Sequence, residues 1–336
     1  HMTSDSHLFR TRADLEADGW QLEGNVFARG GEWYLPLYEA KMIHHFDHRW
    51  ATYGTAGDPA PHGEPDCRDV TLQEKQSPHF APLPRYWVAT QEVHTDSGTR
   101  VHRQNWEIGW RRITNATNER TMVSSILPST GFGDNVFLIR MISEDRRPFW
   151  ATANLSALAL DYVVRQKLGG TNLLFYLVSQ IPVVPCCAYD AIPSWIGSHH
   201  AEGPKSTASV FILSRALELI YTSWDLEPFA RDLLGEMAAH EPAAPGTPAS
   251  PQGAPSSPAS IHHSPFAIHP MAPFRWNEDR RFLLRCELDA AFFHLYLGSE
   301  ANGEWRRAKK EDGCPYDETP EQLAELQAHF PTPRHA

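Results

Sequence analysis

Six polar side chains that can do chemistry follow one another closely in the first part of the sequence. They come directly after a run of apolar and aromatic residues that begins at Tyr34 and has the pattern of a buried strand. Such a strand would anchor the backbone in the core and present the polar residues at its end. We therefore expect a working surface formed by Lys41, His44, His45, Asp47, His48 and Arg49.

Several roles are open to this polar segment. The plainest is a solvated junction between a strand and a loop. A metal site is not predicted, because no Cys pair or His-Glu-x-x-His spacing accompanies the His and Asp side chains. Contact with nucleic acid would use Lys and Arg on phosphates and His and Asp on base edges. Glu39 and Lys41, with Asp18 upstream, are also similar to the acidic residue and Glu-x-Lys pattern of many Mg²⁺-dependent restriction nucleases.

A second polar group lies between two predicted strands. Ile108 and Trp110 alternate with polar neighbours, and residues 121–127 have the composition of another strand. The connector 114–120 is rich in short polar side chains, which by itself indicates an Asx-rich turn. The same side chains would also pair with adenine, guanine or phosphate. The candidates here are Arg111, Arg112, Asn115, Asn118 and Arg120.

A third group ends a predicted helix. Apolar residues from Leu155 onward follow helical spacing, and Gly169-Gly170 is expected to end the helix. Arg165 and Lys167 fall in its last turn, where they would offset the negative end of the helix dipole.

These stretches resemble the C-terminal region of large adenine-specific DNA methyltransferases of the type IIG restriction-modification and phage-defence (DISARM-like) kind. Residues 34–50 are similar to the family segment LPLYEGKMIHQFDHR, residues 106–128 to WRDIxxSTNERTxIxxxLP, and residues 155–185 to FDYVARQKxGGTHLNxxxLxxLPV. Residues 280–296 resemble ERRxxLRAELDAxxxHLYG. Ala40 stands where the family usually has Gly, and Asn172 where it usually has His.

The resemblance implies a region that recognises double-stranded DNA for an adenine (N6) methyltransferase. It makes the glycine turn a candidate for phosphate-backbone contacts through Arg165, Lys167, Gly170, Thr171 and Asn172. The catalytic domain, and with it S-adenosylmethionine, is expected upstream of this chain, and other defence-system subunits are potential partners. The sequence lacks the Asn/Asp-Pro-Pro-Tyr/Phe tetrapeptide that grips a flipped adenine, so we assign no catalytic residue and no cofactor here.

We expect an α+β fold: a DNA target-recognition domain that contains a mixed sheet, with associated helices. The target-recognition domain would cover residues 8–185 and a helical scaffold residues 186–240. Residues 241–272 are rich in Pro, Ala and Ser and are predicted to be a disordered insertion. Residues 273–330 would return as a helical segment that packs on the same body.

The composition and charge of the chain argue against some classes of protein and favour others. The chain has 336 residues and a formal net charge of -11, which argues against a uniformly basic DNA-binding domain. Arginines nevertheless gather between Arg100 and Arg120, so a local positive face is expected. The acidic balance would also suit a scaffold that docks another protein. Scattered cysteines and the lack of a long apolar run predict a cytoplasmic protein with no membrane span.

Overall fold

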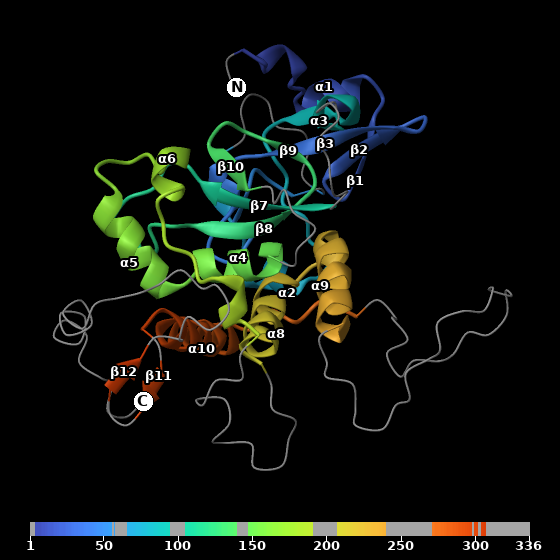
Figure 1. Cartoon of the computed structure of the whole chain (residues 1–336). Coiled ribbons are helices and arrows are strands. Elements are labelled where there is room, and N and C mark those ends of the chain that lie inside the picture. Colours follow the sequence, from blue (N-terminus) through green and yellow to red (C-terminus); the bar gives the residue numbers. More distant parts are fainter. Residues whose placement is uncertain are drawn as a thin grey trace, which may run out of the picture.

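The computed structural model describes residues 4–55, 57, 66–94, 105–139, 147–190, 207–239, 271–297, 299–301 and 304–306. Helices and largely antiparallel sheets form this part of the chain, so the predicted α+β class is confirmed (Figure 1). Most of the predicted insertion at 241–272 and the end of the segment 273–330 lie outside the described residues. Among the helices that the structure describes, none has the length and hydropathy needed to cross a lipid bilayer.

The first sheet is built around β3 (Glu32–Tyr38). Its antiparallel order is β1 (Gln21–Glu23), β2 (Val26–Arg29), β3 and β6 (Trp87–Ala89), and β9 (Gly131–Phe132) pairs with β3 in parallel. The strand predicted from Tyr34 is β3, and it ends at Tyr38 because the 3₁₀ helix η2 (Ala40–Met42) turns the chain away. Beside the sheet lie η1 (Ser6–Leu8), α3 (Thr90–His94) and α1 (Arg12–Ala17), which begins with a capping box between Thr11 and Asp14.

The second sheet, the central sheet, has three antiparallel strands. Its order is β10 (Val136–Ile139), β7 (Trp106–Arg111) and β8 (Ser124–Pro128). Trp106, Ile108 and Trp110 point into the main hydrophobic cluster, which confirms the predicted alternation. The intervening Gly109 faces Leu127 and Val136 on the opposite side of the sheet.

Helices cover one face of this central sheet. They are α4 (Arg147–Leu155), α5 (Leu158–Lys167), α8 (Ala208–Ile220), α9 (Glu227–Ala239) and α10 (Glu278–Leu297), with α6 (Phe175–Val178) at the edge (Figure 1). The helix predicted from residue 155 begins at Leu158, and the described part of the predicted scaffold contains the two helices α8 and α9. The short elements are β4 (Ala51–Thr52), β5 (Arg68–Asp69), α2 (Leu72–Gln76), η3 (Cys186–Ala188), η4 (Trp224–Leu226) and the paired strands β11 (Ser299–Ala301) and β12 (Glu304–Arg306).

One hydrophobic cluster joins the sequence blocks. It takes Trp110 and Trp150 from the predicted target-recognition domain, Ile212 from the predicted scaffold and Leu288 from α10. Trp150 also stacks on Tyr189 across the predicted boundary at residue 185, with the ring centroids 4.8 Å apart. Helices from each of the predicted blocks that the structure describes therefore pack on the central sheet.

Gly109 gives a test of the close packing behind β7. A Cβ at this position would overlap the buried Leu127 side chain and lie 3.4 Å from Cγ1 of Val136. We expect Gly109→Val to lower the free energy of unfolding in urea by about 1–3 kcal/mol. Gly169→Ala is the control, because no atom lies within 4 Å of a Cβ there, and it should change stability by less than about 0.5 kcal/mol. Equal effects of the two changes would contradict this packing.

Candidate nucleic-acid interface

The structure separates the sequence-predicted site residues into a buried set and a surface set. His45, Asp47, His48 and Arg49 are buried, so the prediction that they project from a strand end is wrong. The backbone N–H groups of His44 and Asp47 each donate to the carbonyl of the other, which closes a tight turn. Phe46 inside this turn has a φ of 57° and its N–H donates to the carbonyl of Ser124 in β8. The turn is therefore seated inside the molecule, between β8 and the helices.

Arg49 is fully enclosed and has its partners on distant parts of the chain. Its Nη1 donates to the carbonyls of Ser77 and Phe80, at 2.9 and 3.1 Å. Its Nη2 donates to the carbonyl of Lys75 and to both the carbonyl and the hydroxyl of Thr222. Burial lowers the pKa of the Arg49 guanidinium, partly offset by Asp225 and Asp47. The arginine thus ties the turn to α2 and to the end of α8.

Asp47 and Lys75 form a buried ion pair next to Arg49. Burial raises the pKa of Asp47, but the charges of Lys75 and Arg281 together with its hydrogen bonds outweigh burial, so the pKa is lowered. Nζ of Lys75 also donates to the carbonyl of Arg49 and lies 4.4 Å from the ring centroid of Trp276. Arg281 of α10 lies over the same ring and donates to the carbonyl of Phe46. These contacts join α2 and α10 to the buried turn.

His48 lies beside Ser223 and Asp225, residue types that form catalytic relays in other proteins. Here the hydroxyl of Ser223 and the carboxylate of Asp225 both lie against Nε2 of His48, at 3.1 and 2.9 Å. A relay needs the carboxylate on one ring nitrogen and the hydroxyl on the other. The carboxylate also accepts from the Ser223 hydroxyl. The trio therefore has the geometry of a buried structural contact between the turn and η4.

Surface residues from separate segments meet beyond the end of β7. The N–H of Thr114 donates to the carbonyl of Thr171, and the N–H of Leu173 donates to the carbonyl of Arg112. Ile113 and Asn172 form an isolated antiparallel bridge, which places the glycine turn directly beside the connector 114–120. The predicted residues that are exposed are Lys41, Asn115, Asn118, Lys167, Gly170, Thr171 and Asn172.

The connector is clamped by α5. Arg165 donates to the carbonyls of Ala116, Asn118 and Glu119, at 2.8, 3.0 and 3.1 Å. Asp161, one turn earlier in α5, accepts the backbone N–H groups of Thr121 and Met122. Arg165 is thus engaged within the chain, and the prediction that it contacts DNA does not fit this structure. Its observed contacts hold the loop that presents Asn115 and Asn118.

The other predicted arginines are half-buried. Arg120 pairs with Asp289 of α10 at 2.7 Å, which places it in an internal ion pair instead of on a DNA face. Arg112 lies 3.9 Å from Asp134, and Arg111 donates from Nε to the carbonyl of Ile43 at 2.7 Å. Of these three, Arg111 is the one that has no carboxylate within ion-pair distance in the described part of the chain.

The glycine pair after α5 does not serve as a left-handed helix cap. The C-cap is Leu168 in extended conformation, and neither Gly169 nor Gly170 has a positive φ. A Cβ on either glycine would meet no atom within 4 Å. Nothing in the described chain requires glycine at these exposed positions, which leaves their backbone open to close approach from outside.

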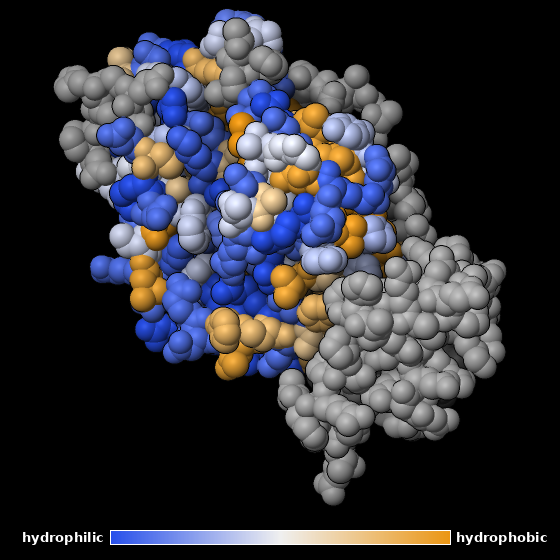
Figure 2. Space-filling view, turned by 90° about the vertical axis from the view of Figure 1, so that its left-hand side faces the viewer, coloured by the Kyte–Doolittle hydropathy of each residue, from blue (hydrophilic) through white to orange (hydrophobic). Residues whose placement is uncertain are grey.

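Apolar side chains border the same surface. Ile113, Phe175 and Tyr176 are 50%, 56% and 60% exposed. Phe175 stacks on Phe137 with the ring centroids 4.3 Å apart. Figure 2, which views the side of the molecule that carries α5 and α6, shows hydrophilic residues over most of the face with hydrophobic patches between them.

A nuclease centre built from Asp18, Glu39 and Lys41 is not favoured by the geometry. Asp18 pairs with Arg10, whereas Glu39 lies 3.4 Å from Arg85. The backbone carbonyl of Asp18 accepts from Arg29, which pairs with the first residue of β3, and Glu39 follows the last. A seven-residue strand spans roughly 20 Å. Within the described ranges there is no group of three or more His, Cys, Asp or Glu side chains that could hold a metal ion.

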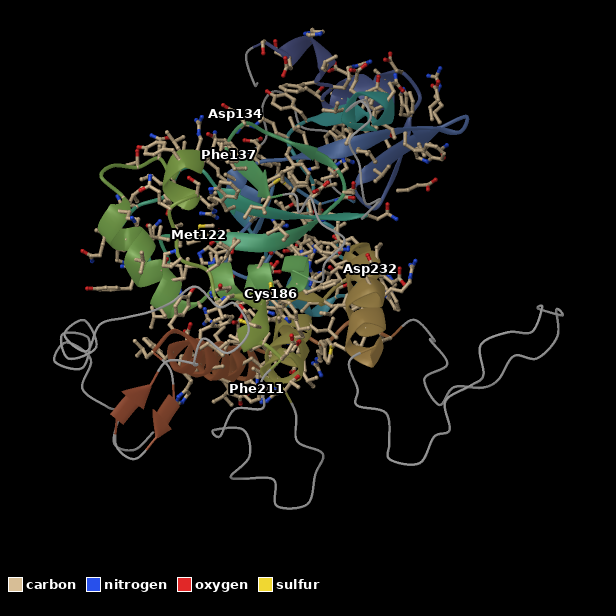
Figure 3. All side chains as sticks on the ribbon, viewed as in Figure 1. Met122, Asp134, Phe137, Cys186, Phe211 and Asp232 are labelled. Atoms are coloured by element: carbon tan, nitrogen blue, oxygen red, sulfur yellow. The ribbon has the colours of Figure 1, made fainter. Side chains whose placement is uncertain are left out.

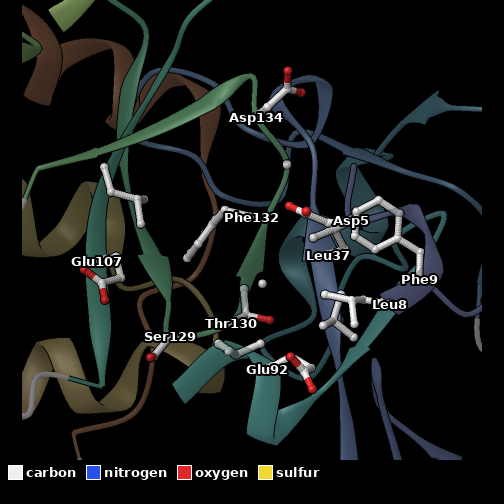
Figure 4. A pocket seen from close by; sticks show the side chains of 15 residues that line it. Asp5, Leu8, Phe9, Leu37, Glu92, Glu107, Ser129, Thr130, Phe132 and Asp134 are labelled. Atoms are coloured by element: carbon white, nitrogen blue, oxygen red, sulfur yellow. The ribbon is translucent and has the colours of Figure 1, made fainter. Parts of the chain in front are cut away.

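A cavity of about 270 Å³ lies between η1, β3 and β9 (Figure 4). Its walls carry the carboxylates of Asp5, Glu92, Glu107 and Asp134. An acidic lining of this kind disfavours phosphate, and none of the predicted surface residues belongs to it.

The chain has no match among protein-family models, curated proteins or solved structures.

Arg49 allows a test of the buried set. We expect Arg49→Met to lower the free energy of unfolding by about 3–5 kcal/mol, because five buried or partly buried acceptors would lose their donor. Urea denaturation followed by tryptophan fluorescence measures the change. Arg280→Met is the matched control: Arg280 is half exposed, pairs with Glu218 on the surface and should cost less than about 1 kcal/mol. A loss below about 1 kcal/mol for Arg49→Met would refute the structural role.

His44 predicts how stability depends on pH. Burial, and next the charge of Arg111, lower the pKa of His44 to about 4. An unfolded His has a pKa of about 6.5, so the unfolded chain binds more protons between these values and stability falls as pH drops through this window. The shift corresponds to at most about 3 kcal/mol. His44→Phe keeps an aromatic ring against Trp50 and should lose this part of the pH dependence. Parallel pH profiles for wild type and His44→Phe would rule the effect out.

Proposed function

We propose that this chain is the DNA target-recognition region of an adenine-specific (N6) methyltransferase of a restriction-modification or phage-defence system, acting in the cytoplasm. One observation carries the proposal: the connector 114–120 and the glycine turn after α5, which resemble the family's motifs, meet on one exposed surface beyond β7. Lys41 of η2 lines a pocket with Arg111 and Ile113 at the edge of this surface. Without this meeting, the resemblance would rest on separated blocks of sequence.

Recognition would combine phosphate contacts with base readout. Lys41 and Lys167 are exposed cations suited to phosphates, and the open backbone at Gly169 and Gly170 allows a phosphate to approach main-chain N–H groups. Asn118 is exposed on the clamped connector, and an Asn side chain can pair with the edge of adenine. Because Arg165 holds three carbonyls of the connector, little conformational entropy would be lost when it meets DNA.

Methyl transfer belongs to a catalytic domain outside this chain. That domain would hold S-adenosylmethionine and the flipped adenine, while this region fixes the position of the duplex. The chain by itself is expected to bind DNA without modifying it.

A protein-docking scaffold is the second candidate. The exposed side chains of Ile113, Phe175 and Tyr176 border the polar surface, and aromatic residues are enriched in protein interfaces. The net charge of -11 would also suit a basic partner subunit.

Fluorescence anisotropy with a random-sequence duplex tests the proposal. The full chain should bind DNA with an affinity that falls steeply with salt, because binding to phosphates releases counterions. Lys167→Gln should weaken binding at all sequences and reduce the salt slope by about 1. Arg280→Gln, on the exposed side of α10, is the control and should leave affinity unchanged.

A gel of the same samples with Mg²⁺ added separates the alternatives. Intact DNA with salt-dependent binding supports recognition, whereas cleaved DNA would require a nuclease. Complete absence of binding would refute DNA recognition by this chain and favour the scaffold.

A further inference from the structure

A small pocket opens beside the last residue of β7. It has a volume of about 280 Å³ and is lined by Glu39, Lys41, Arg111, Ile113, Asp134 and Asn135, among others. Pockets for drug-sized ligands are larger, at about 300–1,000 Å³. Asp134 lies at the turn before β10, on the side of the central sheet away from α10 (Figure 3). The pocket therefore suits a small chemical group and faces away from the helical layer.

The guanidinium of Arg111 lines this pocket with hydrogen-bond donors that have no acceptor in the described chain. Its Nε donates to the carbonyl of Ile43, which fixes the direction of the guanidinium. In the described part of the chain this is its only side-chain hydrogen bond, so both terminal nitrogens keep their donors free. Burial lowers the pKa of Arg111, partly offset by Cys67. A half-buried cation without a hydrogen-bonded anion calls for one from outside.

Lys41 adds a second cation to the same wall. It lies on η2, is exposed and makes no hydrogen bond or ion pair within the described residues. Two like charges that line one small pocket repel each other, and an anion between them would remove that repulsion.

Both acidic residues of the pocket lie within ion-pair distance of an arginine that does not line it, and Oε1 of Glu39 accepts no hydrogen bond in the described chain. Glu39 lies 3.4 Å from Arg85, and Asp134 lies 3.9 Å from Arg112. The side chain of Asn135 also lines the pocket, and its Oδ1 is buried without a hydrogen-bond partner in the described chain. An Asn amide can turn its NH₂ or its oxygen toward a ligand, so it can complete the binding of an oxyanion or its hydroxyl.

We propose that the pocket between η2 and the end of β7 binds a single phosphate group through Arg111 and Lys41. Phosphate fits better than carboxylate, because an arginine fork combined with a lysine point charge is the usual pair for phosphate oxygens. As a site for a backbone phosphate, this inference rests on the proposed function. A free phosphate or phosphomonoester would use the same contacts.

Phosphorus-31 NMR of inorganic phosphate titrated with the full chain tests the pocket directly. Saturable broadening of the phosphate signal is expected for the wild type. Lys41→Gln should reduce the affinity about 3-fold or more, and Arg111→Gln about 10-fold or more. Lys41 is exposed, so its replacement keeps the test valid even if Arg111→Gln loses stability. Arg280→Gln is the control and should leave the affinity for phosphate unchanged. Acetate added as a competitor should displace phosphate poorly.

A parallel anisotropy titration with duplex DNA distinguishes the sources of the phosphate. Weaker binding of both DNA and phosphate by Lys41→Gln, with DNA displacing phosphate from the wild type, supports a backbone-phosphate pocket. Phosphate binding without any DNA binding would retain the pocket for a small phosphate ligand and refute the proposed function. Phosphate binding that does not saturate, or that survives both substitutions, would overturn the pocket whatever DNA does.

Discussion

The buried guanidinium of Arg49 is the interaction on which the rest of the structure depends. Removing a cation from water carries a cost of several kcal/mol, which acceptors on its two terminal nitrogens must offset here. Those acceptors come from Lys75, Ser77 and Phe80 on one side and from Thr222 on the other. The turn, α2 and the end of α8 must therefore assemble together. The neighbouring Asp47–Lys75 pair imposes the same condition on nearby residues.

This internal network leaves the end of the central sheet beyond β7 free to form a surface. The helices pack on Trp106, Ile108 and Trp110, and the other face of β7 ends at Arg111. Because α5 belongs to the same hydrophobic cluster, its side chains can hold the connector from a rigid base. The proposed DNA surface is thus supported by the core although its residues lie outside it.

Charge follows the same division. Most of the arginines singled out from the sequence are neutralised inside the chain, Arg120 by Asp289 and Arg165 by Asp161 and carbonyl groups. With a net charge of -11, the cations left on the surface would give modest affinity for DNA. A catalytic domain that adds its own contacts to the same duplex would raise that affinity through effective concentration.

The sequence by itself determined the α+β class, the strand alternation in β7 and the long helix α10, because these depend on local periodicity. It did not determine which polar residues are buried. Lys75, Thr222 and Asp225 are 26, 173 and 177 residues from their partners Arg49 and His48, and no local pattern marks them. Only the tertiary structure decided that the densest polar segment is internal, because burial depends on which distant groups satisfy a side chain.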